Sequence, residues 1–222
     1  MQSKIEQVSK YIEQIGWGRY NFLSFFICGL SWSTMLMWQG CISISLKQLN
    51  KDWDLTNMQL GLIGSCHTLG VLLGSLLWGY LGDYKGRLQS LKQLFFLYSI
   101  SGGLYTFSLS LSMICTSGIL LGICNGGAQV LTGTLYLETL PTSKKWTLVL
   151  LTICISLGGI FAYFWAIVAI LIDVQIITIW RFVGVVNVVV MIIILLLLRQ
   201  IYESPKFLVS SNQDSQACEV LE

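Results

Sequence analysis

Hydrophobic and polar positions divide the chain into six long apolar runs joined by short polar links. The runs cover residues 22–46, 58–81, 93–112, 113–137, 147–172 and 182–198. A helix needs about 20 apolar residues to cross roughly 30 Å of hydrocarbon, and each run is close to that length. The pattern therefore predicts an all-α protein with six transmembrane helices.

The positions of the charged residues support this interpretation. All 13 Lys and Arg residues and all 11 Asp and Glu residues lie outside the six runs. The chain is 55% hydrophobic and only 11% charged, whereas roughly a quarter of the residues in a soluble domain are charged. A surface helix of a soluble protein would also keep a polar face. The pattern indicates a polytopic, integral membrane protein and does not say in which membrane it lies.

Basic residues are distributed unequally between the two sides of the predicted bundle. If both termini are cytoplasmic, three basic residues lie on the opposite side: Lys47, Lys51 and Arg181. Ten lie on the cytoplasmic side: Lys4, Lys10, Arg19, Lys85, Arg87, Lys92, Lys144, Lys145, Arg199 and Lys206. This asymmetry obeys the positive-inside rule and requires an even number of spans. Tryptophans also fall near the proposed boundaries, as interfacial aromatic residues do: Trp17, Trp53, Trp146 and Trp180.

The chain has three expected parts: an amphipathic segment at residues 1–20, a bundle at 21–208 and a polar tail at 209–222. Apolar residues in the first segment recur every three or four positions, at Ile5, Val8, Ile12 and Ile15. They predict a helix that lies on the membrane or against the bundle, or else a solvated leader helix. Since residues 1–20 are polar, no signal peptide is expected.

Glycines recur at helical spacing in the second and fourth runs. The set comprises Gly70, Gly74, Gly79, Gly118, Gly122 and Gly126. Small residues at such spacings let membrane helices approach closely, so we expect these positions to pack against neighbouring helices. Gly158 and Gly159 in the fifth run mark either another close contact or a flexible point. The third and fourth runs are nearly continuous around 111–116, so their connection must be short. Residues 54–57 offer caps for the second helix.

Four groups of motifs follow one another along the chain. They are Ile15-Gly16-Trp17-Gly18-Arg19-Tyr20 with Cys28-Gly29-Leu30-Ser31-Trp32; Gly61-Leu62-Ile63-Gly64-Ser65 leading to Leu77-Trp78-Gly79-Tyr80-Leu81-Gly82-Asp83; Gly126-Gly127 with Glu138-Thr139-Leu140-Pro141-Thr142-Ser143-Lys144-Lys145; and Glu203-Ser204-Pro205-Lys206-Phe207-Leu208. In this order, over about residues 11–208, they resemble the N-terminal half of a major facilitator superfamily transporter. The most similar branch is the synaptic-vesicle-glycoprotein-2-related and organic-ion transporter group. The resemblance implies solute transport.

The chain also departs from that branch. The resemblance would place an aspartate and a glutamate in the first span, where this chain has Met35 and Trp38, and an arginine where it has Gly118. Tyr84 and Leu88 replace two arginines in the turn after the second span, while Asp83, Gly86 and Arg87 keep the pattern. The second set of six helices is not part of this sequence.

A network of charges is expected at the cytoplasmic face: Asp83, Arg87, Glu138, Lys144, Lys145 and Glu203. The resemblance implies that Asp83 interacts with the positive end of a helix from the other half. The alternative is a solvated carboxylate paired with Lys85 or Arg87. We further expect Arg87 to reach Glu138 and Glu203 to approach Lys144 or Lys145. Such exposed pairs contribute about 0–1 kcal/mol each and would organise this face.

The predicted spans contain few polar groups that could meet a solute. No acidic residue lies at membrane depth, and His67 is either a proton relay or a polar residue satisfied by a neighbouring helix. The candidates for lining a cavity are Gln39, His67, Asn125, Gln129 and Trp38. The amides, Asn187 included, either contact solute or form hydrogen bonds between helices. Trp38 either floors the cavity or fills it.

An enzyme is not expected, because no catalytic set, phosphate loop or dinucleotide motif occurs. The seven cysteines have no paired spacing and there is one histidine, so we expect no disulfide framework, metal or cofactor. Nothing points to nucleic acid as a partner. Two functions remain. The chain is a half-transporter that needs a second bundle or a second copy, or it is a non-transporting accessory subunit of a larger membrane assembly. A truncated product whose second half lies elsewhere is a third possibility.

Overall fold

Helices make up nearly all of the described chain in this computed structural model, which describes residues 2–172, 178–211 and 213–221. The side chains of Lys4 and Ile5 lie outside the described part. Six long helices form the bundle: α2 Arg19–Asp52, α3 Asn57–Lys85, α4 Arg87–Thr106, α5 Leu111–Thr139, α6 Thr147–Leu171 and α7 Ile179–Leu197. The shorter elements are α1 Gln2–Ile15, η1 Thr142–Lys144, η2 Leu198–Gln200, α8 Pro205–Ser210 and α9 Asp214–Leu221.

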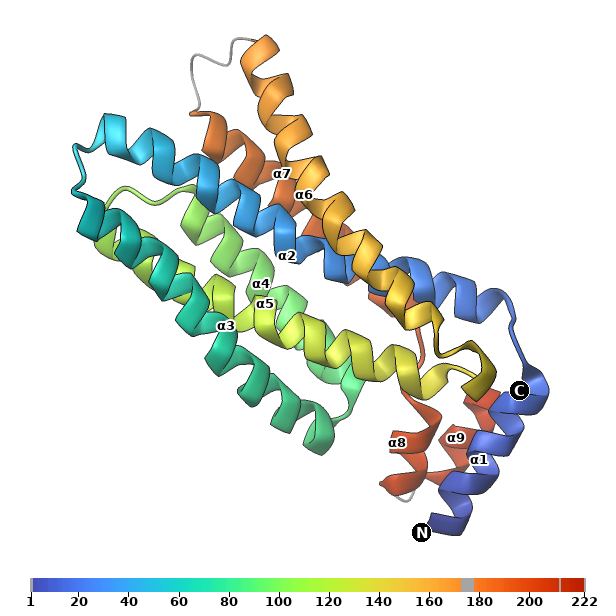
Figure 1. Cartoon of the computed structure of the whole chain (residues 1–222). Coiled ribbons are helices and arrows are strands. Elements are labelled where there is room, and N and C mark those ends of the chain that lie inside the picture. Colours follow the sequence, from blue (N-terminus) through green and yellow to red (C-terminus); the bar gives the residue numbers. More distant parts are fainter. Residues whose placement is uncertain (1, 173–177, 212, 222) are drawn as a thin grey trace.

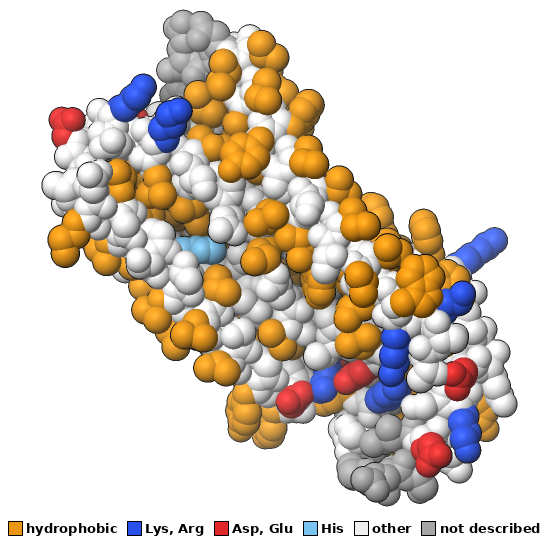
Figure 2. All heavy atoms as spheres, viewed as in Figure 1, with side chains coloured by type: hydrophobic (Ala, Val, Ile, Leu, Met, Phe, Trp, Pro, Cys, Tyr) orange, Lys and Arg blue, Asp and Glu red, His pale blue; other side chains and the backbone are white. Residues whose placement is uncertain are grey.

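The long helices lie in two layers. On the side viewed in Figure 1, α3, α5, α2 and α6 lie next to one another, and α4 and α7 lie behind them. The closest pairs are α3 with α5, α2 with α6, and α4 with α5 and α7. Hydrophobic side chains cover the length of this face, while charged side chains gather near its two ends (Figure 2). The arrangement suits a bundle whose middle is in hydrocarbon.

Among the described residues, five helices are long and apolar enough to cross a membrane: α2, α3, α5, α6 and α7 extended by η2. The predicted third span corresponds to α4, which is not among them, so the number of six spans stays a prediction. The boundary expected at 112/113 is wrong. The helix α4 ends at Thr106, and α5 begins at Leu111 after a link that is short, as expected. The Ser110 side chain accepts a hydrogen bond from the Met113 N–H and starts α5 at that point.

The start of α3 confirms the expected cap. The Thr56 side chain accepts from the Gln59 N–H at 3.4 Å, and the Gln59 side chain accepts from the Thr56 N–H at 2.9 Å. This reciprocal pair is a capping box, which satisfies two backbone donors that the helix leaves free.

The two ends of the chain form one small unit, α1, α8 and α9, which we call the terminal helix cluster. It lies at one end of the bundle and carries both termini (Figure 1). Val8 and Ile12 of α1 are buried against Leu208, Val209 and Ala217. The predicted amphipathic helix therefore packs against other protein helices, and the polar tail contributes a helix of its own.

Glycines decide how closely the helices approach. A Cβ added at Gly70, Gly74, Gly122 or Gly126 would overlap backbone atoms of the facing helix. The predicted packing role is thus present at four positions of the α3–α5 interface. It is wrong for Gly118, where an added Cβ would meet nothing within 4 Å, and a Cβ at Gly79 would make only an ordinary contact at 3.7 Å. Gly158 of α6 meets the Ser33 backbone of α2, so it is a close contact.

Candidate functional site

Arg87, the first residue of α4, joins three helices at the end of the bundle that carries the terminal helix cluster. Its guanidinium lies 2.9 Å from the Asp83 carboxylate of α3 and 3.1 Å from the Glu138 carboxylate of α5. It also donates to the Gly82 carbonyl at 3.2 Å. Arg87 and Glu138 are largely buried, at 16% and 22% side-chain exposure, whereas Asp83 is 74% exposed. The expected contact between Arg87 and Glu138 is therefore present, and it is the better shielded of the two pairs.

The partners predicted for Glu203 differ from those that it has in the structure. Its carboxylate accepts hydrogen bonds from the backbone N–H groups of Leu88 at 3.0 Å and Gln89 at 3.3 Å. It thus caps the start of α4, where the helix dipole favours an anion. The expected ion pair of Glu203 with Lys144 or Lys145 is not among the ion pairs of the described residues. Gly86 makes this possible. It has a φ of +102°, and a Cβ there would lie 2.6 Å from the Glu203 carboxylate.

Two neighbours of Glu203 complete this site. The Phe207 ring of α8 lies 5.7 Å from the centre of the Arg87 guanidinium, a distance at which an aromatic face attracts a cation. Burial lowers the pKa of Lys206, the charge of Lys145 lowers it further, and Glu138 opposes the shift. The sequence placed Phe207 in the fourth group of motifs but indicated no function for it. Its contact with Arg87 depends on how α8 folds back under α4.

A second candidate site is the seam between α2 and α5. The Gln129 side-chain nitrogen contacts the Met35 sulfur across this seam. Gln39 lies one turn after Met35 on α2 and is exposed, and Asn125 lies one turn before Gln129 on α5 and is buried. Since the two helices run in opposite directions, these residues lie at similar depths. We call Gln39, Asn125 and Gln129 the amide strip.

Trp38 lies away from this seam. It is fully buried, its indole N–H donates to the Met191 sulfur of α7 at 3.4 Å, and its ring packs against Tyr98 and Tyr105 of α4. It fills the space between α2, α4 and α7. The expectation that Trp38 lines a cavity is therefore wrong, and the alternative of filling is right.

The remaining polar candidates lie between helices. The Asn187 side chain of α7 donates to the Met37 carbonyl of α2 at 3.1 Å, which is the interhelical hydrogen bond considered above. His67 of α3 is 9% exposed, and its Nε2 atom is buried without a hydrogen-bond partner among the described residues. The His67 backbone carbonyl packs against Gly122 of α5. These contacts give His67 a place in the α3–α5 interface.

Within the described part of the chain, no cluster of three or more His, Cys, Asp or Glu side chains could hold a metal ion. The chemistry of both sites is that of ion pairs and hydrogen bonds. Such groups bind and position, and they do not supply a nucleophile with its base.

Comparison with known proteins identifies the family to which the chain is similar. The sugar (and other) transporter family matches residues 18–222. The synaptic vesicle 2-related protein of Rattus norvegicus is 33% identical over 65% of this chain and 26% of its own length. The niacin transporter NiaP of Acinetobacter baylyi is 27% identical over 60% of this chain and 30% of its own length. The chain thus spans less than a third of these relatives.

Solved structures show the same architecture. The proton:xylose symporter XylE bound to 6-bromo-6-deoxy-D-glucose superposes with a TM-score of 0.81 at 22% identity, over 91% of this chain and 49% of that chain. The partially occluded, inward-open form of XylE from E. coli gives a TM-score of 0.80 at 21% identity, over 92% of this chain and 53% of that chain. At this identity the likeness shows the fold alone.

Family and fold are both those of transporters. The family match covers the six long helices and the C-terminal residues beyond them. The bundle has the arrangement of the N-terminal half of a major facilitator protein. The chain belongs to the sugar (and other) transporter family of the major facilitator superfamily.

Proposed function

We propose that this chain supplies one of the two bundles of a solute transporter and works together with a second bundle. Alternating access requires two bundles that rock about a site near the midplane of the membrane. The chain covers about half of the symporter structures that it resembles. The second bundle would be a separate protein, a second copy of this chain or further sequence.

The second bundle would lie against the face formed by α3, α5, α2 and α6. In the most apolar stretch of α3 only 17% of the residues are buried, and in that of α6 only 22%, against 56% in α2 and in α5. The two flanking helices therefore present most of their surface outward. Lipid could cover that surface as well as protein does. The proposal therefore depends on the polar groups of α2 and α5, which lie between the two flanking helices.

The amide strip is the observation that carries this proposal. An amide in hydrocarbon is costly unless it has hydrogen-bond partners, and the Gln129 nitrogen contacts a thioether sulfur, which is a weak acceptor. A second bundle would enclose this strip, and a polar, uncharged solute would offer it stronger partners. Met35 and Trp38 stand where the resemblance implies acidic residues, which favours an uncharged solute over a cation.

The charge site would then serve as one half of a latch. Arg87 holds α3, α4 and α5 together, while the exposed Asp83 carboxylate remains available to a helix of the second bundle. The basic residues flanking the helices at this end support a cytoplasmic position for the terminal helix cluster and for both termini.

Mass and uptake measurements test the proposal. The full chain would be extracted into nanodiscs from the cells in which it is made, and the mass of the particle's protein content determined. We expect a mass above the 24.9 kDa of one chain. Proteoliposomes of that assembly should take up a polar solute from a panel of sugars, polyols and vitamin amides, and Gln129→Leu should reduce uptake at least tenfold. The control variant Gln200→Leu, outside the seam, should keep it. A strict monomer without a partner would refute the half-transporter proposal.

The second candidate is a non-transporting subunit that has kept the fold. Trp38 favours it, since a fully buried indole fills a position where the resemblance implies a charged residue. This function predicts a stoichiometric complex with no uptake of any solute in the panel. Robust uptake that depends on Gln129 would exclude it.

A further inference from the structure

A groove of about 380 Å³ lies between the start of α2 and the start of α6. It is lined by Trp17, Phe22, Phe25, Lys144, Trp146, Thr147 and Leu150. Neither the amide strip nor Arg87 belongs to it, so the proposed transport function leaves it unexplained.

Lys144 is the charged group of this groove. No acidic residue is among the described residues that line it. Glu13 of α1 accepts a hydrogen bond from the Thr142 hydroxyl two residues before Lys144, so this carboxylate lies beside the turn and is not among the residues that line the groove. The Thr147 hydroxyl donates to the Lys144 carbonyl at 2.8 Å. Lys144 has no ion-pair partner among the described residues, so an anion entering the groove would meet an unpaired ammonium group.

The aromatic rim of the groove has the composition of a membrane boundary. Trp17 is 41% exposed, Trp146 is 57% exposed and Phe22 is 67% exposed. Tryptophan is enriched at the level of lipid headgroups, and lysine there extends its ammonium towards the phosphates. Both α2 and α6 begin at this point, so the groove opens where the bundle enters the headgroup layer.

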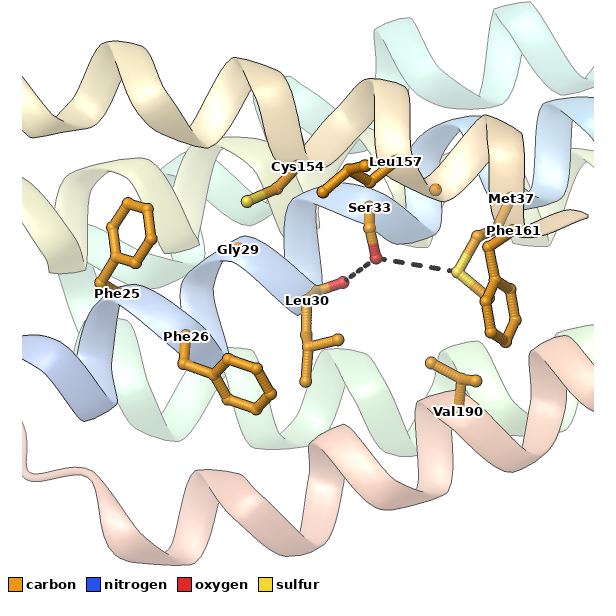
Figure 3. A pocket seen from close by; sticks show the side chains of 11 residues that line it. Phe25, Phe26, Gly29, Leu30, Ser33, Met37, Cys154, Leu157, Phe161 and Val190 are labelled. Atoms are coloured by element: carbon orange, nitrogen blue, oxygen red, sulfur yellow. Dashed lines mark hydrogen bonds between the residues drawn. The ribbon is translucent and has the colours of Figure 1, made fainter.

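An apolar pocket of about 330 Å³ lies beside the groove, along α2 and α6 and with Val190 of α7 in its wall. Phe25 lines both spaces, and the pocket runs past Gly29, Leu30 and Leu157 to Met37 and Phe161 (Figure 3). The Ser33 hydroxyl in its wall donates to the Leu30 carbonyl at 2.7 Å and is thereby satisfied. Phe25 to Met37 spans about 18 Å of helix at 1.5 Å per residue, close to one leaflet of a hydrocarbon core roughly 30 Å thick.

We infer that the groove and the pocket together bind one anionic phospholipid. Its phosphate lies against Lys144 between Trp17 and Trp146, and one acyl chain lies in the pocket between α2 and α6. A cationic end joined to an apolar slot one leaflet long matches a lipid, whereas a soluble anion would leave the slot empty. One basic residue near an anionic headgroup is worth about 1 kcal/mol, so the preference over a zwitterionic lipid should be about fivefold.

Native mass spectrometry of the purified full chain can count bound lipids. The protein would be titrated with phosphatidylglycerol or phosphatidylcholine carrying the same acyl chains. We expect about fivefold tighter binding of phosphatidylglycerol, which Lys144→Gln abolishes. Lys85→Gln, which removes another exposed lysine at the same end of the bundle, should leave the preference unchanged. Equal affinity for the two lipids, or a preference that survives in K144Q, would overturn the inference.

A second arm distinguishes a lipid from its headgroup. Soluble glycerol phosphate at millimolar concentration should not displace the lipid, because it cannot occupy the slot. Leu30→Trp should fill the slot and weaken both lipids equally, and thermal unfolding of this variant checks that it is folded. Displacement by glycerol phosphate, or unchanged lipid binding in folded L30W, would contradict the assignment of the acyl chain.

Discussion

Replacing Gly74 by alanine should weaken the bundle, whereas the same change at Gly118 should not. A Cβ at Gly74 would lie 2.5 Å from the Ile123 Cα and 2.6 Å from its carbonyl carbon, and it would overlap the carbonyl oxygen. Nonbonded carbons normally lie about 3.5–4.0 Å apart, so α3 and α5 would have to separate by about 1 Å. The atoms concerned are backbone and cannot rotate away.

The expected magnitude follows from two opposing effects. Overpacking costs about 1–3 kcal/mol, and a clash between backbones belongs near the upper end. Alanine favours a helix over glycine by about 1 kcal/mol. Gly74→Ala should therefore lower the free energy of unfolding by about 2 kcal/mol. A Cβ at Gly118 would meet nothing within 4 Å, so the second effect acts alone, and G118A should gain up to about 1 kcal/mol.

Unfolding in mixed micelles measures this difference. The purified chain would be titrated with a denaturing detergent and its helix content followed by far-ultraviolet circular dichroism. The free energy of unfolding should fall in G74A and rise in G118A, so that the two variants differ by about 3 kcal/mol. If G74A were as stable as G118A, the close backbone contact between α3 and α5 would be refuted.

The remaining predictions concern the charge site and use the same unfolding assay. A double-mutant cycle of Arg87→Gln and Glu138→Gln should give a coupling of about 1–2 kcal/mol, since the pair is shielded from water; zero coupling would contradict the contact. Glu203→Gln should cost about 1–2 kcal/mol through loss of the charged cap on α4, whereas Asp83→Asn, at an exposed pair, should cost less than about 1 kcal/mol. An equal loss of stability in E203Q and D83N would contradict the role of Glu203 as a cap. Burial lowers the pKa of Lys206, so the unfolded chain binds more protons and stability should rise as pH increases towards the ordinary lysine value. Lys206→Met should abolish that part of the pH dependence, and an unchanged pH profile would contradict it.

Membrane helices were predictable because their signal is compositional. Hydrocarbon tolerates few charges, so runs without charges mark the spans, and five of them fall on helices of sufficient length. The third run was misplaced by six residues, since Phe107 and Leu109 extend the apolar pattern beyond the end of α4 at Thr106. Hydropathy alone does not show that α4 begins at Arg87, after Gly86, and is capped by the distant Glu203.

The candidate sites were predictable only in part. Arg87 and Glu138 belong to motifs, and the structure brings them together as expected. Glu203 was assigned the wrong partners, because its position under α4 depends on how the chain turns after η2. Trp38 was placed near a cavity, although its helix presents it to α4 and α7.

By itself, the sequence determined the class of protein, the approximate spans and the side on which basic residues gather, because these follow from the cost of charge and of unpaired backbone in hydrocarbon. Only the tertiary structure decided which glycines allow two helices to touch. Gly118, Gly122 and Gly126 have the same spacing, yet a Cβ at Gly118 would meet no atom of another element within 4 Å, whereas a Cβ at either of the other two would meet backbone of α3. The reason is geometric. Spacing places residues on one face of a helix, but the crossing of two helix axes selects the part of that face that is in contact.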